Sequence, residues 1–560
     1  MEKIWLKHYP EGVPAEIDVG RYGSLVSLLD ESFRRFAGQP AYKFMGRSFT
    51  FQQINENSRA LAGYFQTLGL TPGDRVAVML PNVPQYPVAV AAILRAGLVV
   101  VNVNPLYTPR ELAHQLKDSG AKALILMENF ATTLQQCLKE LPPLNMVLTS
   151  LGDMLPFPKN LLVNATVKYI KKLVPSFRLP GAVPWNDALS SGRAHGFLAA
   201  SVGPDDLAVL QYTGGTTGIS KGAMLRHRNL VANILQSEAW YRPALSKIPL
   251  AEQLHTVCAL PLYHIFGFNI NMMLSLRLGG CNILLANPRD LPSLFKTLAK
   301  ERFHSFPAVN TLFSSMLNHP LFSTVNWSHL QLAVGGGMAV TSTTAADWLK
   351  KTGCPIVEGY GLSETSPSVS CNPVNSSHYS GNIGMPLPNT EIALLDDEGH
   401  EVPAACSGEI AIRGPQVMAG YWQRPEETAQ SFTADGFFRT GDIGTVDEQG
   451  YFKIVDRKKD MILVSGFNVY PTEIENVVSR MPQVLECAVV GIPDPKTGEA
   501  VKLVIVKRQP ECTEAEVRAF CEANLTGYKR PKLIEFRATL PKTHVGKILR
   551  RMLRDTPEQK

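Results

Sequence analysis

The sequence predicts an α/β protein with more than one domain. Short runs of apolar, often β-branched residues with the length of buried strands recur along the chain, as in Arg75–Leu80, Leu207–Tyr212 and Leu330–Gly335. Amphipathic helical patterns separate many of these runs, and strands that alternate with helices form mainly parallel sheets covered by helices. The chain has 560 residues. A single hydrophobic core stops growing at roughly 250–300 residues, so at least two domains are expected.

The expected elements follow from the spacing of apolar residues in chain order. Helices are expected at Pro109–Ser119 and Leu291–Glu301, where apolar residues recur at helical spacing. The expected buried strands, each an apolar run too short for a helix, are Arg75–Leu80, Ala121–Met127, Leu207–Tyr212, Thr256–Leu260, Cys281–Ala286, Leu330–Gly335 and Pro355–Gly359.

The pattern changes after residue 380. Two short strands, Glu391–Asp396 and Glu409–Arg413, are divided by the turn residues Asp397-Glu398-Gly399, which predicts a small β subdomain. A charged cluster, Asp456–Asp460, then precedes a final α+β segment. We therefore expect one domain at 1–456 and a second at 457–560, with a hinge between them.

Charge and cysteine content narrow the function classes. The net charge is +6, and the whole excess lies after Asp456, because the chain up to that residue is balanced. A basic terminal module favours an anionic partner, namely a nucleotide, a nucleic acid or a membrane surface, although chance explains so small an excess equally well. The nine cysteines include no C-x-x-C pair, which argues against disulfides and structural zinc and is typical of the reducing cytosol.

Membrane insertion is not expected. The N-terminus lacks the apolar stretch of a signal peptide. The most apolar segment, Val88–Val103, is interrupted by Arg95 and is shorter than the roughly 20 residues that span a bilayer. The segment Leu162–Val174 has an apolar stripe of Val163, Val167, Ile170 and Val174 with lysines away from it. It reads as a basic membrane-surface helix or as an ordinary helix packed on the core, and we favour the second.

The strongest local signal is the segment Tyr212–Gly222, which follows an expected strand. Its glycines let backbone N–H groups approach an anion, while its threonines, Ser220 and Lys221 add hydroxyl donors and a positive charge. It is not the Walker A pattern, because Lys221 is followed by Gly222 rather than Ser or Thr. No G-x-G-x-x-G follows the early strands, which disfavours a dinucleotide-dependent dehydrogenase. A phosphate-binding loop is therefore predicted.

This loop resembles the phosphate loop of the adenylate-forming superfamily, which includes acyl-CoA synthetases, nonribosomal adenylation domains and beetle luciferases. Four more motifs resemble those of the family and follow in the same order: Gly359–Thr365 (adenine and magnesium), Phe438–Gly444 (ribose), Asp456–Asp460 (hinge) and Gly546-Lys547 (catalytic lysine). The resemblance extends from Trp5 to Arg554. Val101–Leu112 and Asp460–Pro471 make it closest to bacterial long-chain fatty acid–CoA ligases.

The resemblance implies a fold and site roles. The fold is a large N-terminal domain of two α/β sheet subdomains plus a small β-barrel subdomain, followed by a small mobile α+β C-terminal domain. Tyr360 would lie against adenine, Asp442 would accept the ribose hydroxyls, and Arg457 would support the ribose or the phosphates. Glu364 would bind Mg²⁺, for which a carboxylate is a suitable ligand. Ser363 stands where the family usually has Thr, and its hydroxyl keeps the α-phosphate contact available.

The remaining roles concern chemistry and movement. Lys547 would reach between the substrate carboxylate and the α-phosphate, and Lys459 would be the pivot of domain rotation. His264, in the family's acyl-pocket motif, would line the carboxylate entrance. The predicted catalytic residues are Lys547, Glu364, Thr213 and His264. The predicted nucleotide- and CoA-binding residues are Thr213, Gly214, Gly215, Thr216, Thr217, Gly218, Lys221, Gly336, Gly359, Tyr360, Ser363, Asp442, Arg457, Lys459 and Gly466; Lys529, Arg530 and Lys532 are weaker candidates for the CoA phosphates.

The implied activity is that of a long-chain fatty acid–CoA ligase that uses MgATP and CoA. A fatty acid and ATP would give acyl-AMP and pyrophosphate, and CoA would then give acyl-CoA and AMP. A ligase for a medium-chain or aryl acid shares every nucleotide motif and stays open, as does a luciferase-like oxygenase; a non-catalytic binder is disfavoured. ATP and CoA are polyanions, so the basic excess requires no nucleic acid. We expect a cytoplasmic protein; peripheral contact with the inner face of the cytoplasmic membrane and a homodimer are left open.

Overall fold

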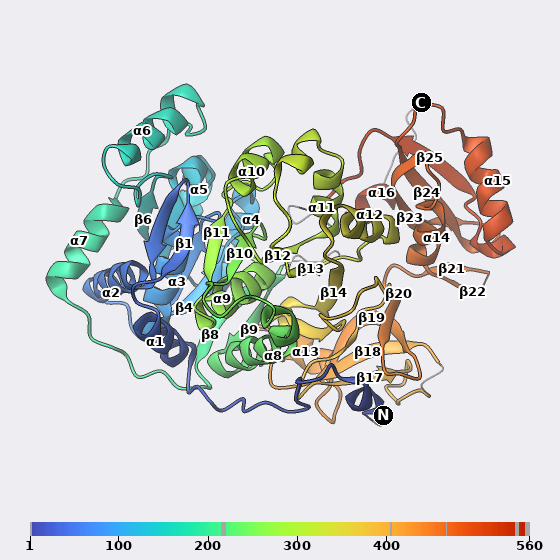
Figure 1. Cartoon of the computed structure of the whole chain (residues 1–560), viewed down its shortest axis with the longest axis horizontal. Helices are drawn as coiled ribbons and strands as arrows, with labels where there is room; N and C mark the ends of the chain where they lie inside the picture. The colour runs from blue at the N-terminus through green and yellow to red at the C-terminus, as the bar shows by residue number, and fades with distance from the viewer. Residues whose placement is uncertain (1–2, 214–219, 404–405, 466, 544–547, 555–560) are drawn as a thin grey trace.

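The computed structural model describes residues 3–213, 220–403, 406–465, 467–543 and 548–554. In Figure 1 the N-terminal sheets occupy the left and centre, a small antiparallel sheet lies below, and the C-terminal sheet lies at the right. The helices are α1 Leu25–Arg35, α2 Phe51–Thr67, α3 Gln85–Arg95, α4 Pro109–Ser119, α5 Ala131–Cys137, α6 Lys159–Ala165, α7 Trp185–His195, α8 His227–Leu245, α9 Leu274–Arg277, α10 Leu291–Leu298, α11 Asn310–Leu317, α12 Ser342–Thr352, α13 Pro425–Ser431, α14 Pro471–Val478, α15 Glu514–Asn524 and α16 Arg551–Arg554.

Two large, mainly parallel sheets confirm the α/β prediction. The seven-stranded sheet has the order β7 (Ala182–Pro184), β6 (Asn145–Thr149), β5 (Ala123–Met127), β3 (Arg75–Met79), β4 (Val99–Asn102), β8 (Leu207–Thr213), β9 (Lys221–Arg226). The nine-stranded sheet has the order β16 (Met385–Pro386), β15 (Ser368–Cys371), β14 (Ile356–Gly361), β13 (Leu332–Gly335), β12 (Ser305–Ala308), β10 (His255–Cys258), β11 (Cys281–Leu284), β1 (Pro40–Phe44), β2 (Arg47–Thr50). Each strand expected from the sequence is present in one of them.

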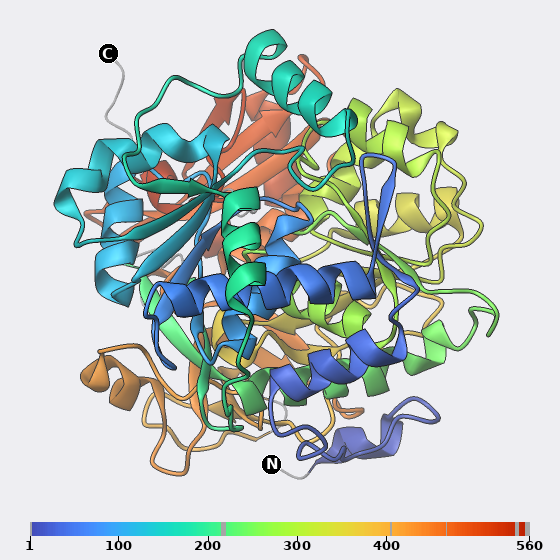
Figure 2. The ribbon, with the colours of Figure 1, turned by 90° about the vertical axis from the view of Figure 1, so that its left-hand side faces the viewer.

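The N-terminal hairpin joins the two halves of the large domain. Strand β1 pairs in parallel with β11 and places Tyr42 opposite Asn282. After the hairpin β1–β2, the chain continues into the seven-stranded sheet with β3. Helix α3 is buried along its whole length, and α1 packs against α2, α3, α8 and α9. The blue helices α1 and α2 cross the side seen in Figure 2. One continuous apolar core therefore runs through both sheets.

The most apolar segment of the sequence lies inside this core. It forms α3 and then β4, and Arg95, which ends α3, is buried with its guanidinium 3.3 Å from Asp30. Among the described residues, none of the helices combines the length and the apolar character needed to span a bilayer.

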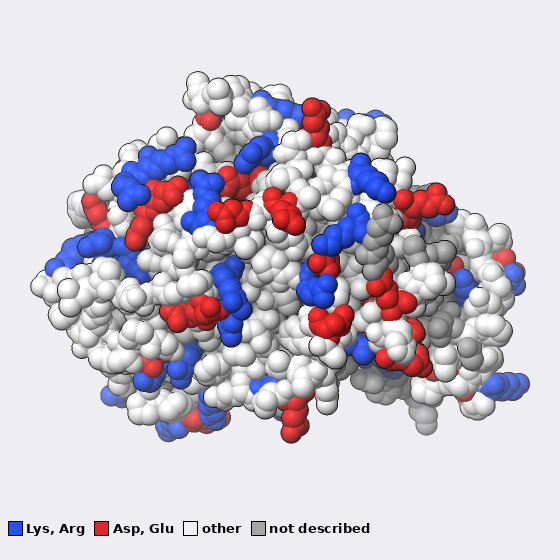
Figure 3. Space-filling model, turned by 90° about the horizontal axis from the view of Figure 1, so that it is seen from below, with Lys and Arg blue, Asp and Glu red and all other residues white. Residues whose placement is uncertain are grey.

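The predicted small β subdomain is a four-stranded antiparallel sheet. Its order is β17 (Glu391–Leu395), β18 (Gly408–Arg413), β19 (Phe438–Val446), β20 (Phe452–Arg457), which is an open path among the described strands. On the face seen from below, basic and acidic side chains are interspersed (Figure 3).

The C-terminal segment has its own sheet and core. Its strands are β22 (Phe467–Val469), β21 (Ile462–Val464), β24 (Gly498–Lys507) and β23 (Val484–Asp494), with β25 (Leu533–Arg537) paired in parallel to β24. Helices α14 and α15 cover an apolar core that includes Val489 and Leu503. The change of sheet falls between Arg457 and Ile462, next to the predicted hinge; the domain division and its mobility stay predictions.

Candidate active site

The predicted ribose and adenine residues contact one another. Asp442 on β19 lies opposite Arg457 on β20, and their side chains form an ion pair with 3.0 Å between Oδ1 and Nε. Tyr360, on β14 of the neighbouring sheet, donates its hydroxyl hydrogen to Oδ2 of Asp442 at 2.6 Å. Burial, and then the Asp442 charge, raise the pKa of Tyr360 well above its ordinary value. The Asp442 carboxylate is therefore held in one orientation by two elements.

The phosphate-loop prediction falls on a β-hairpin. Thr213 ends β8 and pairs with Lys221, the first residue of β9, and the hydroxyl of Ser220 donates to the Thr213 carbonyl at 2.7 Å. Two antiparallel strands thus hold both ends of the loop in register. Five predicted loop residues, as well as Gly466 and Lys547, lie outside the described residues: Gly214, Gly215, Thr216, Thr217 and Gly218.

Tyr421 connects the loop to the predicted metal ligand and was not predicted. Its hydroxyl donates to Oε1 of Glu364 at 2.8 Å, and the ammonium of Lys221 lies 5.3 Å from the centre of its ring. The tyrosine reaches this place because the segment around it pairs with β9, with Trp422 N–H donating to the Gly222 carbonyl at 2.8 Å. That pairing is long-range, so no local sequence pattern indicated it.

Glu364 is suited to bind a cation whose other ligands come mainly from a bound substrate. It lies with Ser363 on a short 3₁₀ turn, Ser363–Thr365, that packs against β8 and β9, and the residue is 9% exposed. Among the described residues, no three His, Cys, Asp or Glu side chains cluster as metal ligands. A single carboxylate fits Mg²⁺, which usually takes one or two protein carboxylates and completes its shell with substrate phosphates and water.

The acyl-pocket motif packs against the glycines of the nucleotide motifs. A Cβ atom at Gly336 would lie 2.9 Å from the ring of Phe266 and 3.4 Å from the carbonyl oxygen of Gly359. Gly336 therefore allows β13, β14 and the motif to approach closely. His264 is half-buried in the same segment, and its Nδ1 accepts the N–H of Phe266 at 3.3 Å.

A cavity of about 290 Å³ lies beside the ribose residues. Its lining comes from β19 and from the hinge itself: Thr440, Gly441, Arg457, Lys458 and Lys459. Burial, followed by the nearby Arg457 charge, lowers the pKa of Lys459, while Asp460, Asp442 and Glu364 oppose the shift. The predicted pivot lysine therefore faces the carboxylates of the site.

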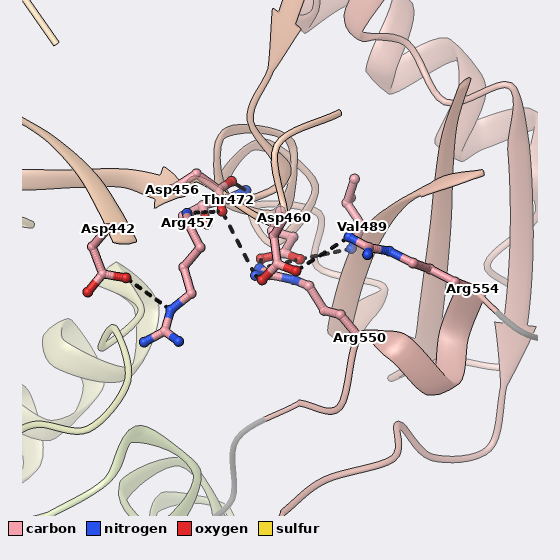
Figure 4. A network of polar contacts seen from close by, with 9 residues as sticks. Asp442, Asp456, Arg457, Asp460, Thr472, Val489, Arg550 and Arg554 are labelled. Atoms are coloured by element: carbon pink, nitrogen blue, oxygen red, sulfur yellow. Dashed lines mark hydrogen bonds and ion pairs between the residues drawn. The ribbon is translucent and has the colours of Figure 1, made fainter. Parts of the chain in front are cut away.

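A polar network crosses the hinge (Figure 4). Asp456 on β20 accepts the N–H of Arg457 at 2.7 Å and the N–H of Thr472, in the first turn of α14, at 2.9 Å. Arg550 lies 3.9 Å from the same carboxylate and binds Asp460 at 3.2 Å and Glu475 at 2.8 Å. The residues that follow the predicted lysine motif are thus tied to the hinge and to α14.

Comparison with known proteins identifies this arrangement. Residues 29–422 match the AMP-binding enzyme family and residues 473–547 match the AMP-binding enzyme C-terminal domain. The chain belongs to the AMP-binding enzyme family. It is 53% identical to a long-chain-fatty-acid–CoA ligase of Escherichia coli O6:H1, over 99% of this chain and 98% of that protein.

Two further relatives of this AMP-binding enzyme act on other acids, as their names state. A feruloyl-CoA synthase of Amycolatopsis is 34% identical over 91% of this chain and 94% of that one. The crystal structure of the anthranilate CoA ligase AuaEII with anthranoyl-AMP superposes with a TM-score of 0.82 at 26% identity, covering 96% of this chain and 98% of that one. The predicted α/β fold, with large N-terminal sheet domains and a small C-terminal domain, is confirmed. Closure of the small β subdomain into a barrel and the roles of individual site residues stay predictions.

We expect Tyr360→Phe to weaken the nucleotide site while leaving the aromatic ring in place. The variant loses a hydrogen bond to a buried carboxylate, which is worth about 1.5–3 kcal/mol, so KM for ATP should rise by roughly tenfold or more. The KM for ATP is measured from steady-state pyrophosphate release. Tyr9→Phe is the control, because that hydroxyl donates to the Pro386 carbonyl. Equal KM values in the two variants would contradict the ATP role.

The burial of Asp456 predicts that the stability of the folded protein depends on pH. Burial raises the pKa of Asp456 from 3.8 to about 6, against the opposing effects of the Thr472 N–H and Arg550. Between pH 3.8 and about pH 6 the folded protein binds the proton of the Asp456 carboxyl more tightly than the unfolded chain does. The contribution of this proton to the stability of the fold is therefore present at low pH and is lost as the pH rises through 6.

The measurement is Tm by scanning fluorimetry from pH 4 to pH 6.5. Asp456→Asn removes the titrating group, so the Tm of the wild type should fall relative to that of the variant across this window. Asp447→Asn, which changes an exposed carboxylate in the turn between β19 and β20, should track the wild type. A constant difference between wild type and Asp456→Asn would rule out the proposed titration.

Proposed function

We propose that this AMP-binding enzyme is a long-chain fatty acid–CoA ligase. The supporting observation is the combination of full-length similarity to the Escherichia coli ligase with the mutual contacts of the predicted nucleotide residues Tyr360, Asp442 and Arg457. A fatty acid and ATP give acyl-AMP and pyrophosphate, and CoA then gives acyl-CoA and AMP.

The first half-reaction joins two anions, which the protein must hold together. A carboxylate oxygen of the acid attacks the α-phosphorus, the bond to pyrophosphate breaks, and a mixed anhydride forms. Asp442 would accept the ribose hydroxyls and Tyr360 would support the adenine. Thr213 and Lys221 would bind the phosphates at the hairpin, and Lys547 would offset the charge that builds up between the carboxylate and the α-phosphate.

Glu364 would hold Mg²⁺ against the phosphates. When bound, the ion would neutralise phosphate charge and so make the α-phosphorus easier to attack. The hydrogen bond from Tyr421 to Oε1 orients the Glu364 carboxylate. Ser363, on the same turn, would contact the α-phosphate through its hydroxyl.

The second half-reaction needs a different arrangement of the C-terminal segment. The CoA thiol attacks the acyl carbonyl, its proton is released, and AMP leaves. Rotation about Lys459 would withdraw Lys547 and bring the segment around Gly466 toward the pantetheine arm. Because Asp456 precedes the pivot and Thr472 follows it, their hydrogen bond would break in this step.

The acyl site is the least constrained part of the proposal. His264 would line the carboxylate entrance. The helical segment that follows it in the chain lines a cavity of about 20 Å³ with apolar side chains such as Ile270, Leu274 and Leu278. That volume holds about one water molecule, so the acyl chain would require this region to open.

We also propose a cytoplasmic location with peripheral contact at the inner membrane face, since long-chain acids partition into bilayers. A homodimer is a further prediction, which light scattering tests.

AMP release measured with and without CoA across a panel of acids tests the activity. Palmitate and oleate should give CoA-dependent AMP release well above that with octanoate, and benzoate should give the least. The activity with ferulate tests the second candidate function, that of an aryl-acid ligase, because the Amycolatopsis relative is a feruloyl-CoA synthase. A profile that favours aromatic acids would replace the fatty acid by an aryl acid, and oxygen consumption with a luciferin would indicate an oxygenase.

Lys547→Ala should separate the half-reactions. We expect adenylation, measured by pyrophosphate release, to fall by about a hundredfold or more, because removing one charge-stabilising group at a transition state costs roughly that much. Thioester formation from supplied acyl-adenylate should largely survive. Arg551→Ala, a nearby exposed cation, is the matched control. Equal losses in both half-reactions would exclude the assigned role.

A further inference from the structure

An unusual number of large apolar side chains is exposed in one short segment. Helix α6 and the π-helical turn that follows it, Thr166–Ile170, carry them together with their flanks. Six side chains are between 55% and 79% exposed: Phe157, Leu161, Leu162, Tyr169, Ile170 and Leu173. We call this set the apolar ridge. Large apolar side chains left exposed together in one segment are uncommon on a monomer and indicate a contact site.

The ridge is not needed to hold the segment on the protein. Val167 and Val174 are buried and provide its apolar packing. Asn164 accepts the N–H of Gly152 at 2.7 Å and donates to Asp153 at 2.9 Å, while the ammonium of Lys159 donates to the Met45 carbonyl. The ridge side chains therefore face solvent from a backbone fixed by other residues.

The expected stripe of Val163, Val167, Ile170 and Val174 is only partly correct. Val167 and Val174 face the core as expected, but Ile170 is 75% exposed. The reason is the π-helical turn, in which hydrogen bonds span five residues and each residue advances by a smaller angle than in an α-helix. Ile170 is thereby turned away from Val167, and the segment has apolar residues on both faces.

Charge indicates the partner. Lys168, Lys171 and Lys172 are exposed within the same segment, beside the apolar side chains. An apolar surface with basic residues at its border suits an anionic bilayer, in which apolar groups enter the acyl boundary and ammonium groups meet lipid phosphates. Membrane contact was the weaker of the two interpretations of the sequence, and the exposed ridge now favours it.

The position of the ridge agrees with this partner. Helix α6 lies at the top in Figures 1 and 2, at the end of the large domain away from the C-terminal sheet. Helix α6 and the C-terminal sheet therefore lie on opposite sides of the molecule in Figure 1. We propose that the apolar ridge and its lysines dock the enzyme on an anionic lipid bilayer. This inference rests on the proposed function only in that a membrane-dissolved acid gives the contact its use.

Vesicle flotation of the full-length protein tests the docking. Wild type should float with vesicles of phosphatidylcholine containing a quarter phosphatidylglycerol and should bind pure phosphatidylcholine vesicles more weakly. The variant Leu161→Ser, Leu162→Ser, Ile170→Ser should lose at least about tenfold in bound fraction, because three inserted side chains are removed. Leu198→Ser, Leu250→Ser is the matched control, since both leucines are highly exposed elsewhere.

The charge contribution has its own variant. Lys168→Gln, Lys171→Gln, Lys172→Gln should bind both kinds of vesicle equally, because the preference for phosphatidylglycerol depends on these ammonium groups. Wild type that stays off both vesicles, or serine variants that bind as well as wild type, would overturn the proposal. A wild-type dimer that becomes monomeric in the serine variant, with vesicle binding unchanged, would assign the ridge to a second copy of this chain. CoA-dependent AMP release from palmitate without vesicles reports the ligase activity separately, so its absence would count against the proposed function alone.

Discussion

The buried carboxylate of Asp456 is the contact on which the described arrangement depends. Asp456 is the penultimate residue of β20, and its carboxylate accepts the N–H of Thr472 in the first turn of α14 and lies 3.9 Å from Arg550. The next residue, Arg457, pairs with Asp442 in the predicted ribose site. One short stretch of β20 therefore fixes the nucleotide residues on one side and the C-terminal segment on the other. Moving the C-terminal segment requires this carboxylate to exchange the Thr472 N–H for another partner.

The sequence predicted most of the fold because the strands are strongly marked. Buried parallel strands read as short apolar runs, and each of the seven expected runs forms a strand. The strands that the sequence analysis did not predict, such as β1 and β6, carry polar residues or lie at sheet edges, where the apolar pattern is weaker. Pairings such as β1 with β11 are set by tertiary packing of the large domain and leave no trace in local sequence.

The candidate site was predictable where a motif carries its own chemistry. The pairing of Asp442 with Tyr360 and Arg457 joins three motifs that were recognised separately. Tyr421 was missed because only the pairing of its segment with β9 brings it to Glu364. Ile170 was misplaced because a π-helical turn changes the helical period, which an assumed α-helix cannot anticipate. In both cases a distant or irregular backbone decides where an ordinary side chain points.

The basic excess after the hinge also has a more specific explanation than its count suggested. Lys532 pairs with Asp494, Lys529 lies 2.8 Å from Glu473, and Arg550 binds two carboxylates of the same segment. These cations stabilise the C-terminal segment. Lys529 and Lys532 are therefore poorer candidates for the CoA phosphates than their charge implied, because a phosphate would have to displace a carboxylate already in place. The cations that line the cavity beside the predicted ribose residues lie instead at the predicted hinge, in Arg457, Lys458 and Lys459. Because the predicted hinge itself carries this charge, the proposed rotation about it would change the electrostatic field in this cavity, and it would thereby couple the position of the C-terminal segment to the charge of a ligand bound there.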